Sequence, residues 1–587
     1  MFAFGPSVSD HGVEFRLWAP SQRSVFLQID GIQRGPMRAS SDGWHHYTST
    51  EARPGSLYSF VLDSGLTVPD PASRFQPDDV HGQSEVINGS SFTWSVPEWR
   101  GRPWDETVLY ELHIGAFTQQ GTFLAAIDRL DHLQSLGITA IQIMPVADFP
   151  GRRGWGYDGV YPYAPESSYG RPEHLKRLID EAHLRGISVF LDVVYNHFGP
   201  DGNYMPGYAP LFTDRHDTPW GPAVNFDGES SDPIRQFILE NAIYWITEFR
   251  FDGLRLDAVH AMKDDGDDHI LDVLARRVRE AAGNRHVHLI VENEENDSDL
   301  LTRDQEGRAH LFDAQWNDDI HHALHVLATD ETFGYYADYT PAAPLLGKTL
   351  AEGFVFQGQH MPYRGKARGK RSADLPPTAF ISFIQNHDQI GNRAMGDRVI
   401  SGLPDRVIRA LASIYLLAPQ IPMLFMGEEW NANQPFPYFC DFDAELNEKV
   451  RRGRREELSK LPGFDADDLL DPTEAVVFES AKLDWSKLDG QPGAQHLSFY
   501  ANLLALRRRH ILPLLGSIGC GSFDRECLPL VSVRWPLSDG RSLHLLCNPG
   551  NEALEAPDES FDGEKILHLG TPGSMIEPWS VFWSVSV

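Results

Sequence analysis

Side chains that can act in catalysis follow four short apolar runs in the middle of the chain. In order, these runs end with Asp192, Asn196 and His197; with Arg255, Asp257 and His260; with Glu292, Glu294 and Glu295; and with Asn386, His387 and Asp388. One such ending can simply be a helix N-cap, because Asp and Asn cap helices routinely. Four endings of this composition, on strands that converge, indicate a site built from carboxylates.

Arg255 and Asp257 are two residues apart in an apolar run, so in a strand they point to the same face. Leu254 and Leu256 then point to the opposite face, toward surrounding helices. An arginine beside a carboxylate keeps it ionised and oriented, as a nucleophile requires. The alternative is a structural salt bridge.

Glu292 comes directly after the apolar run HLIV. A glutamate between an apolar wall and other carboxylates suits a general acid. Glu294 and Glu295 are rivals by position, and we favour Glu292 because it comes first after the strand. Asp388 supplies a third carboxylate, and with His197 and His387 as donors it can hold sugar hydroxyls and stabilise positive charge.

Metal binding is the competing interpretation of these Asp and His residues. The sequence has no H-E-x-x-H spacing, and the acidic run from Asp264 to Asp268 lacks the EF-hand pattern. The four cysteines form no C-x-x-C pair. We therefore expect neither a metal nor a cofactor.

The elements that must position these residues alternate between apolar runs and helical segments. Eight strand-like runs begin near residues 107, 138, 187, 251, 287, 310, 379 and 421, and helical periods follow them, as in 122–137, 172–186 and 405–418. This rhythm predicts an α/β fold, a (β/α)₈ TIM barrel over residues 100–510, with catalytic groups at the carboxyl ends of its strands. An open doubly wound sheet is the alternative, but no G-x-G-x-x-G or P-loop follows any strand.

Short alternating strands separated by Gly, Pro, Ser and Asp turns flank this region on both sides. Residues 1–99 predict an N-terminal β-sandwich, and residues 511–587 predict a small C-terminal β-domain.

The composition limits the classes of partner. Acidic residues exceed basic ones, 83 against 51, which gives a net charge of −32. Such a chain lacks the basic stripe that nucleic acid requires. No apolar run is long enough for a membrane helix, and the first residues show no secretory signal. With four cysteines in so long a chain, we expect a cytoplasmic protein.

Several segments resemble the α-amylase family of glycoside hydrolases. DVVYNH, GLRLDAVH, the first Glu of VENEEND, and QNHD are similar to its four short regions, and WGYDGVYPYAPESSYG matches a further one. The resemblance implies a retaining hydrolase with Asp257 as nucleophile, Glu292 as acid/base and Asp388 as transition-state stabiliser. It implies that the substrate is held by Trp155, Tyr157, Asp192, His197, Arg255, His260, Trp316, Asn386 and His387. VENEEND departs from many amylases, since it lacks a Gly before the Glu.

Within the family, YELHIGAFTQQGTF, NHFGPDGNY and FMGEEW most resemble the trehalohydrolases. This resemblance implies cleavage of the α-1,4 bond next to the terminal trehalose of malto-oligosyltrehalose, in a pathway with a malto-oligosyltrehalose synthase. We expect the loops at 199–225, with Tyr204, Tyr208 and Trp220, and at 313–319, with Trp316, to meet the trehalose. A branching or debranching enzyme and a non-catalytic glucan-binding protein are the alternatives.

Overall fold

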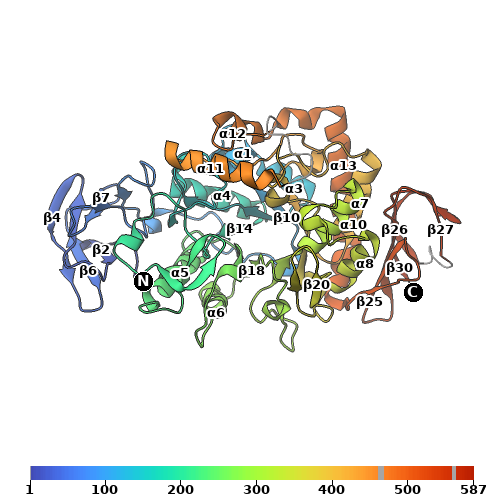
Figure 1. Cartoon of the computed structure of the whole chain (residues 1–587), viewed down its shortest axis with the longest axis horizontal. Helices are drawn as coiled ribbons and strands as arrows, with labels where there is room; N and C mark the ends of the chain where they lie inside the picture. Colours follow the sequence, from blue (N-terminus) through green and yellow to red (C-terminus); the bar gives the residue numbers. More distant parts are fainter. Residues whose placement is uncertain (1, 461–468, 558–562, 587) are drawn as a thin grey trace.

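A closed barrel of parallel strands forms the centre of the molecule (Figure 1). The computed structural model describes residues 2–460, 469–557 and 563–586. The barrel strands are β10 (Leu109–Leu112), β11 (Ala140–Ile143), β14 (Ser188–Val193), β17 (Gly253–Leu256), β18 (His288–Val291), β19 (Ala314–Trp316), β22 (Phe380–Ser382) and β23 (Ile421–Phe425). Each lies within one of the eight runs read from the sequence, so the barrel prediction is confirmed.

The barrel interior has an apolar layer beneath a polar one. Leu109, Phe190 and Ile290 belong to one buried cluster inside the barrel. Because strand side chains alternate, the residues two positions further on also point inward, and for these three strands they are Glu111, Asp192 and Glu292. The polar layer therefore opens at the carboxyl ends of the strands.

Helices cover the outside of the barrel, where apolar periods predicted them. They include α4 (Pro172–Leu184), α5 (Asp232–Thr247), α6 (Ile270–Ala282), α7 (Asp318–Thr329), α10 (Asp405–Leu417) and α13 (Gln491–Leu506). The predicted segment of helical period at 122–137 contains two short helices, α2 (Phe123–Ile127) and α3 (Leu130–Leu136), with Asp128 and Arg129 between them.

A long excursion follows the sixth barrel strand. It contains α7, α8 (Ala342–Glu352) and a hairpin of β20 (Gln359–Met361) and β21 (Lys366–Arg368). Another follows the eighth strand, with α11 (Ala444–Leu458) and α12 (Ala475–Ala481). The hairpin was not predicted, since its strands are three residues long and mostly polar.

Two β-units lie at opposite ends of the molecule in Figure 1. At the N-terminal end, β2 (Gly12–Trp18) and β6 (Trp44–Ser49) belong to one antiparallel sheet, and β3 (Phe26–Ile29) and β7 (Leu57–Val61) to another. Phe15 and Tyr58 join the two sheets, with ring centroids 4.8 Å apart. This is the predicted sandwich.

The C-terminal unit is a five-stranded sheet in the order β24 (Ser522–Phe523), β25 (Val531–Pro536), β26 (Ser542–Asn548), β30 (Ser580–Ser586) and β28 (Glu564–Leu569). It is anchored to the barrel because the Trp583 indole donates to the Ser413 carbonyl of α10 at 2.9 Å. The first and last residues of the predicted flanking units, Met1 and Val587, lie outside the described residues. Among the described helices, none has the length and apolarity to cross a membrane.

Asp252 ties together the end of the barrel opposite the site. Its carboxylate accepts from the Trp99 indole at 2.9 Å, from the Val189 backbone N–H at 3.0 Å and from Arg285 at 3.0 Å, and it pairs with His183 at 2.8 Å. These partners come from the linker, from β14, from the segment after α6 and from α4. Its side chain is fully buried.

We expect Asp252→Ala to lower the free energy of unfolding by about 3–5 kcal/mol, because it leaves the largely buried Arg285 guanidinium and the other donors without their acceptor. Denaturant unfolding measures this loss. Asp267→Ala removes the same group from an exposed loop and should change little. Equal stability of both variants would show that the Asp252 network does not hold the barrel together.

Candidate active site

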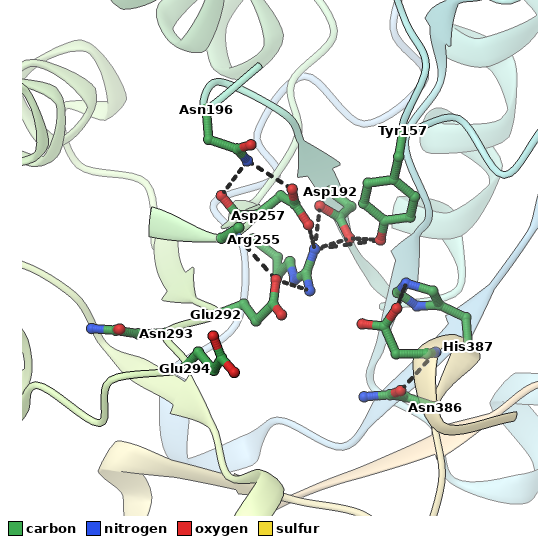
Figure 2. A network of polar contacts seen from close by, with 12 residues as sticks. Tyr157, Asp192, Asn196, Arg255, Asp257, Glu292, Asn293, Glu294, Asn386 and His387 are labelled. Atoms are coloured by element: carbon green, nitrogen blue, oxygen red, sulfur yellow. Dashed lines mark hydrogen bonds and ion pairs between the residues drawn. The ribbon is translucent and has the colours of Figure 1, made fainter. Parts of the chain in front are cut away.

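The Arg255 guanidinium occupies the centre of the polar layer, with no solvent exposure (Figure 2). Its Nη1 donates to Asp192 at 2.7 Å and to Asp257 at 2.9 Å, and its Nη2 donates to Glu292 at 2.9 Å. One cation thus joins three carboxylates from β14, from the end of β17 and from the end of β18. The prediction that Arg255 and Asp257 share a face is confirmed.

Asp257 is held through both carboxylate oxygens. Oδ1 accepts from Arg255, while Oδ2 accepts from the Asn196 side-chain amide at 2.7 Å. The same amide donates to the Asp257 carbonyl at 2.9 Å. Two donors fix the direction of the carboxyl group, and the side chain is 11% exposed, facing the pocket.

Glu292 has one oxygen bound by the protein. Arg255 and the Ala258 backbone N–H both donate to Oε2, the latter at 3.0 Å. Ala258 reaches this position with a left-handed backbone at φ 40°, a conformation that costs a non-glycine residue energy. Within the described residues, no protein donor binds Glu292 Oε1, and the side chain lines the pocket.

The rival glutamates face other partners. Glu294 forms an ion pair with Arg364 and approaches His260 at 3.7 Å, while Glu295 pairs with Lys366 at 2.7 Å. Among these three acids, only Glu292 contacts Arg255 within the described part of the chain, and Figure 2 shows Glu294 apart from that guanidinium.

The seventh strand brings Asp388 to the opposite wall. Asn386 caps α9 (His387–Gly391), because its side-chain oxygen accepts from the Asp388 backbone N–H at 2.9 Å. His387 is buried between two acids, with Nδ1 2.7 Å from Glu111 and Nε2 3.4 Å from Asp388. Burial alone lowers the pKa of His387, but Asp388 and Glu111 raise it overall to about 9. The ring is therefore an imidazolium at neutral pH.

The charges of this layer shift one another's protonation. Burial lowers the pKa of Arg255, but Asp192, Tyr157, Glu292 and Asp257 outweigh it and raise that pKa well above its ordinary value. Burial raises the pKa of Asp192 to about 7 despite the Arg255 contact. Tyr157 also donates to Asp192, at 2.8 Å.

A pocket of about 970 Å³ opens above this layer. Seven of the twelve site residues expected from the sequence line it, and they are Trp155, Tyr157, His197, Asp257, His260, Glu292 and Asp388. The other five are buried below its surface, and they are Asp192, Arg255, Trp316, Asn386 and His387. The Tyr157 ring stacks on His387, with centroids 5.2 Å apart.

Some of the expected aromatic contacts lie elsewhere. Trp316 is 2% exposed and packs against Arg255, whose Cζ lies 4.1 Å from the ring centroid, so it supports the guanidinium from below. Tyr208 is buried and Tyr204 faces His81, and neither lines the pocket. Trp220 does line it and stacks on His197.

The sequence reasoning missed several residues of this site. Glu111 points inward from the first barrel strand, and Asp318 follows the sixth, so the same reasoning about polar residues near strand ends could have found both. Arg364 and Arg368 come from the unpredicted hairpin and line the pocket, and no sequence signal pointed to them.

Metal-ligating side chains meet away from this pocket. In residues 2–460, 469–557 and 563–586, the one group of three that could hold an ion is His216, Asp227 and Asp265. None of them lines the pocket, and Arg215 lies 3.3 Å from Asp227, which disfavours a cation there.

The His387 ion pairs make a stability prediction. Since the folded pKa of about 9 exceeds the ordinary value near 6.5, these pairs stabilise the fold fully below about pH 6.5. This stabilisation is lost as pH rises through about 9. His387→Gln should therefore be less stable than wild type at about pH 7, and the difference should shrink at about pH 10. Denaturant unfolding at both pH values checks this, with the exposed His310→Gln as control; a constant difference would contradict it.

Comparisons with known proteins agree with this geometry. A family model described as the α-amylase catalytic domain matches residues 82–208, and a domain of unknown function, DUF3459, matches residues 523–583. The malto-oligosyltrehalose trehalohydrolase of Saccharolobus solfataricus is 42% identical over 86% of this chain and 87% of its own. That of Mycobacterium tuberculosis is 39% identical over 95% and 96%, respectively.

A crystal structure described as a putative alpha amylase from Salmonella typhimurium has a TM-score of 0.96 and 41% identity, with both chains fully covered. The barrel, its carboxylate layer and relatives of this similarity along most of their length lead to one assignment: the chain belongs to the malto-oligosyltrehalose trehalohydrolases of the α-amylase family of glycoside hydrolases.

Proposed function

We propose that this chain is a retaining glycoside hydrolase that cuts the α-1,4 bond next to the terminal trehalose of malto-oligosyltrehalose. The substrate follows from the names of its relatives. The observation that carries the chemistry is the bridge from Arg255 to both Asp257 and Glu292. Because the carboxyl groups of Asp257 and Glu292 bond the same guanidinium, they are held close together. This supports the separation of about 5–5.5 Å between the two carboxyl groups of a retaining enzyme, against about 6.5–9.5 Å in an inverting one.

Asp257 is the nucleophile in this proposal. It attacks the anomeric carbon and forms a glycosyl-enzyme, while Glu292 gives its proton to the glycosidic oxygen and trehalose leaves. Glu292 then takes a proton from water, which attacks the same carbon and releases the malto-oligosaccharide with its configuration retained. Asn196 and Arg255 support the first role, because they hold both oxygens of Asp257.

Asp388 stabilises the positive charge that develops on the sugar ring, and the charged His387 holds it in place. Tyr157 offers its ring face to the sugar at the cleavage point, with its hydroxyl fixed by Asp192. His197 lines the same wall, but both of its nitrogens face protein acceptors, the Tyr157 carbonyl and the Asn196 side-chain oxygen. His197 therefore shapes the subsite more than it binds hydroxyls.

The cellular compartment, the source of the substrate and the domain limits are also proposals. The described chain has four free cysteines, two of them buried, which suits a reducing compartment such as the cytoplasm. The substrate has to come from an enzyme that builds trehalose at the end of a malto-oligosaccharide, the synthase expected from the sequence. We keep the domain limits near residues 99 and 510; the first falls in the linker between β9 (Ser84–Glu85) and β10.

Product analysis tests the function. Wild-type protein should release trehalose from malto-oligosyltrehalose much faster than it cuts a maltodextrin of equal length. NMR should show the new reducing end first as the α-anomer. Equal kcat/KM on the two substrates would reduce the enzyme to a general glucan hydrolase, and α-1,6 products would identify a branching enzyme. A protein that binds without turnover would be a glucan-binding protein.

Substitutions separate the roles of the carboxylates. Asp257→Asn should abolish turnover and retain binding, because the amide is nearly isosteric but cannot act as nucleophile. Glu292→Gln should be nearly inactive on natural substrate, yet recover on an aryl glycoside whose leaving group needs no proton. Glu294→Gln is the matched control and should keep most activity. If only Glu294→Gln showed this recovery, the acid assignment to Glu292 would be wrong.

A further inference from the structure

Asp318 lies in the pocket without a role in the chemistry described so far. It is the first residue of α7, directly after the sixth barrel strand, and it lines the pocket together with Glu292 and Asp388. Its neighbour Asp319 is buried and fully engaged by Arg368 and the Val355 backbone N–H. Two adjacent acids thus have different environments, one inside the protein and one facing the cavity.

Gln389 orients the Asp318 carboxyl group. The Gln389 side-chain oxygen accepts from the Asn386 backbone N–H at 3.0 Å, so its NH₂ group must point the other way. That NH₂ group donates to Asp318 Oδ1 at 3.2 Å. Within the described part of the chain, this is the hydrogen bond of the Asp318 side chain, and Oδ2 is therefore available to a ligand.

The surroundings favour a proton on this group. Burial, together with the charges of Glu292, Asp388 and Asp319 and against that of Arg368, raises the pKa of Asp318 to about 7. A protonated carboxyl group can donate a hydrogen bond as well as accept one. Below about pH 7, where it is mostly protonated, Asp318 thus offers the donor and acceptor pair that a sugar hydroxyl satisfies.

The position of Asp318 places it on the side of the pocket where the leaving group binds. The acid Glu292 must touch the glycosidic oxygen, so the departing sugar lies beyond Glu292, away from Tyr157 and His197. Glu292 is the charged group that acts most strongly on Asp318. One helical turn further along α7, His322 continues the same pocket wall, and its ring lies 5.2 Å from that of Tyr335.

We propose that Asp318 is a specificity-determining residue that hydrogen-bonds a hydroxyl of the first leaving-group sugar, in an orientation set by Gln389. This inference rests on the proposed hydrolase function. It differs from the assignments above because Asp318 binds the sugar that departs, whereas Tyr157 and Asp388 face the sugar that is attacked.

The test compares a sugar leaving group with an aryl one. On malto-oligosyltrehalose, Asp318→Ala should lose kcat/KM by a factor on the order of 10–100, as expected for a lost hydrogen bond from a buried polar group. On an aryl α-malto-oligoside, which has no sugar beyond the cleaved bond, it should stay close to wild type. Asp318→Asn keeps a donor and an acceptor and should recover most of the loss.

A pH profile adds a second readout. Wild-type kcat/KM on malto-oligosyltrehalose should fall as pH rises through about 7, because Asp318 loses its donor. Asp318→Asn should lack this fall. The titratable and charged groups that face Asp318 are Glu292, Asp319, Tyr335, Tyr339, Arg368 and Asp388, and they are unchanged in this variant.

Asp232→Asn is the matched control, since Asp232 also opens a helix, α5, but is exposed. It should leave both substrates unaffected. An equal loss on both substrates for Asp318→Ala would place Asp318 in the chemistry at Glu292 or Asp388 and overturn the proposal, as would no loss on either. If wild type released no trehalose, the proposed function would fail, but the role of Asp318 could still be tested. The test would compare the kcat/KM of Asp318→Ala on maltoheptaose, which has a sugar leaving group, with its kcat/KM on the aryl substrate.

Discussion

The burial of one guanidinium constrains the whole active site. An arginine with no solvent exposure is costly unless its charge is matched, and the two Nη groups of Arg255 bond Asp192, Asp257 and Glu292, with the Trp316 ring below the guanidinium. Three carboxylates exceed one cation, so each acid also needs a donor of its own from elsewhere in the barrel. These second donors are a tyrosine hydroxyl, an asparagine amide and a backbone N–H. Strands β14, β17 and β18 are therefore held in one register at their carboxyl ends, where the reacting groups stand.

The same arrangement determines the sign of the field in the pocket. Five acids surround two cations: Glu111, Asp192, Asp257, Glu292 and Asp388 against Arg255 and His387. Even with a proton on the acid Glu292 and one on Asp192, the other three carboxyl groups outnumber the two cations. A site with surplus negative charge is suited to a sugar that becomes positive in the transition state. Because these groups are held by hydrogen bonds and ion pairs at the floor of the pocket, they need little reorganisation when that charge appears. The cost of this preorganisation is the burial of charge, with the neighbouring Asp257 adding to it, and it is reflected in the raised pKa of Asp192.

Most polar site residues at the carboxyl ends of barrel strands could be predicted, and those on the inserted hairpin could not. Strand alternation and the convergence of strand ends placed Arg255 beside Asp257 and selected Glu292 over Glu294 by its distance from the strand. The same reasoning extends to Glu111, inside β10, and to Asp318, two residues after β19, and both were overlooked. An aromatic such as Trp316 is different, since no local pattern distinguishes a ring that faces a cavity from one that packs under a guanidinium. The hairpin of β20 and β21 has no periodicity long enough to predict, and its contacts are with residues about 70 positions earlier.

That hairpin shows how the chain separates chemistry from selectivity. In the proposed mechanism, the groups that act on the anomeric carbon lie directly after the carboxyl ends of barrel strands, while the wall beyond Glu292 comes from α7 and from the segment that follows it. The two parts are nevertheless coupled. Arg368 donates to the Glu294 carbonyl at 2.7 Å, and Lys366 pairs with Glu295. The hairpin therefore contacts the loop that begins with Glu292. Arg368 also binds Asp319, next to Asp318 on α7. A leaving group that fits between α7 and the hairpin therefore rests against the elements that position Glu292, so recognition of that sugar and delivery of its proton depend on the same contacts.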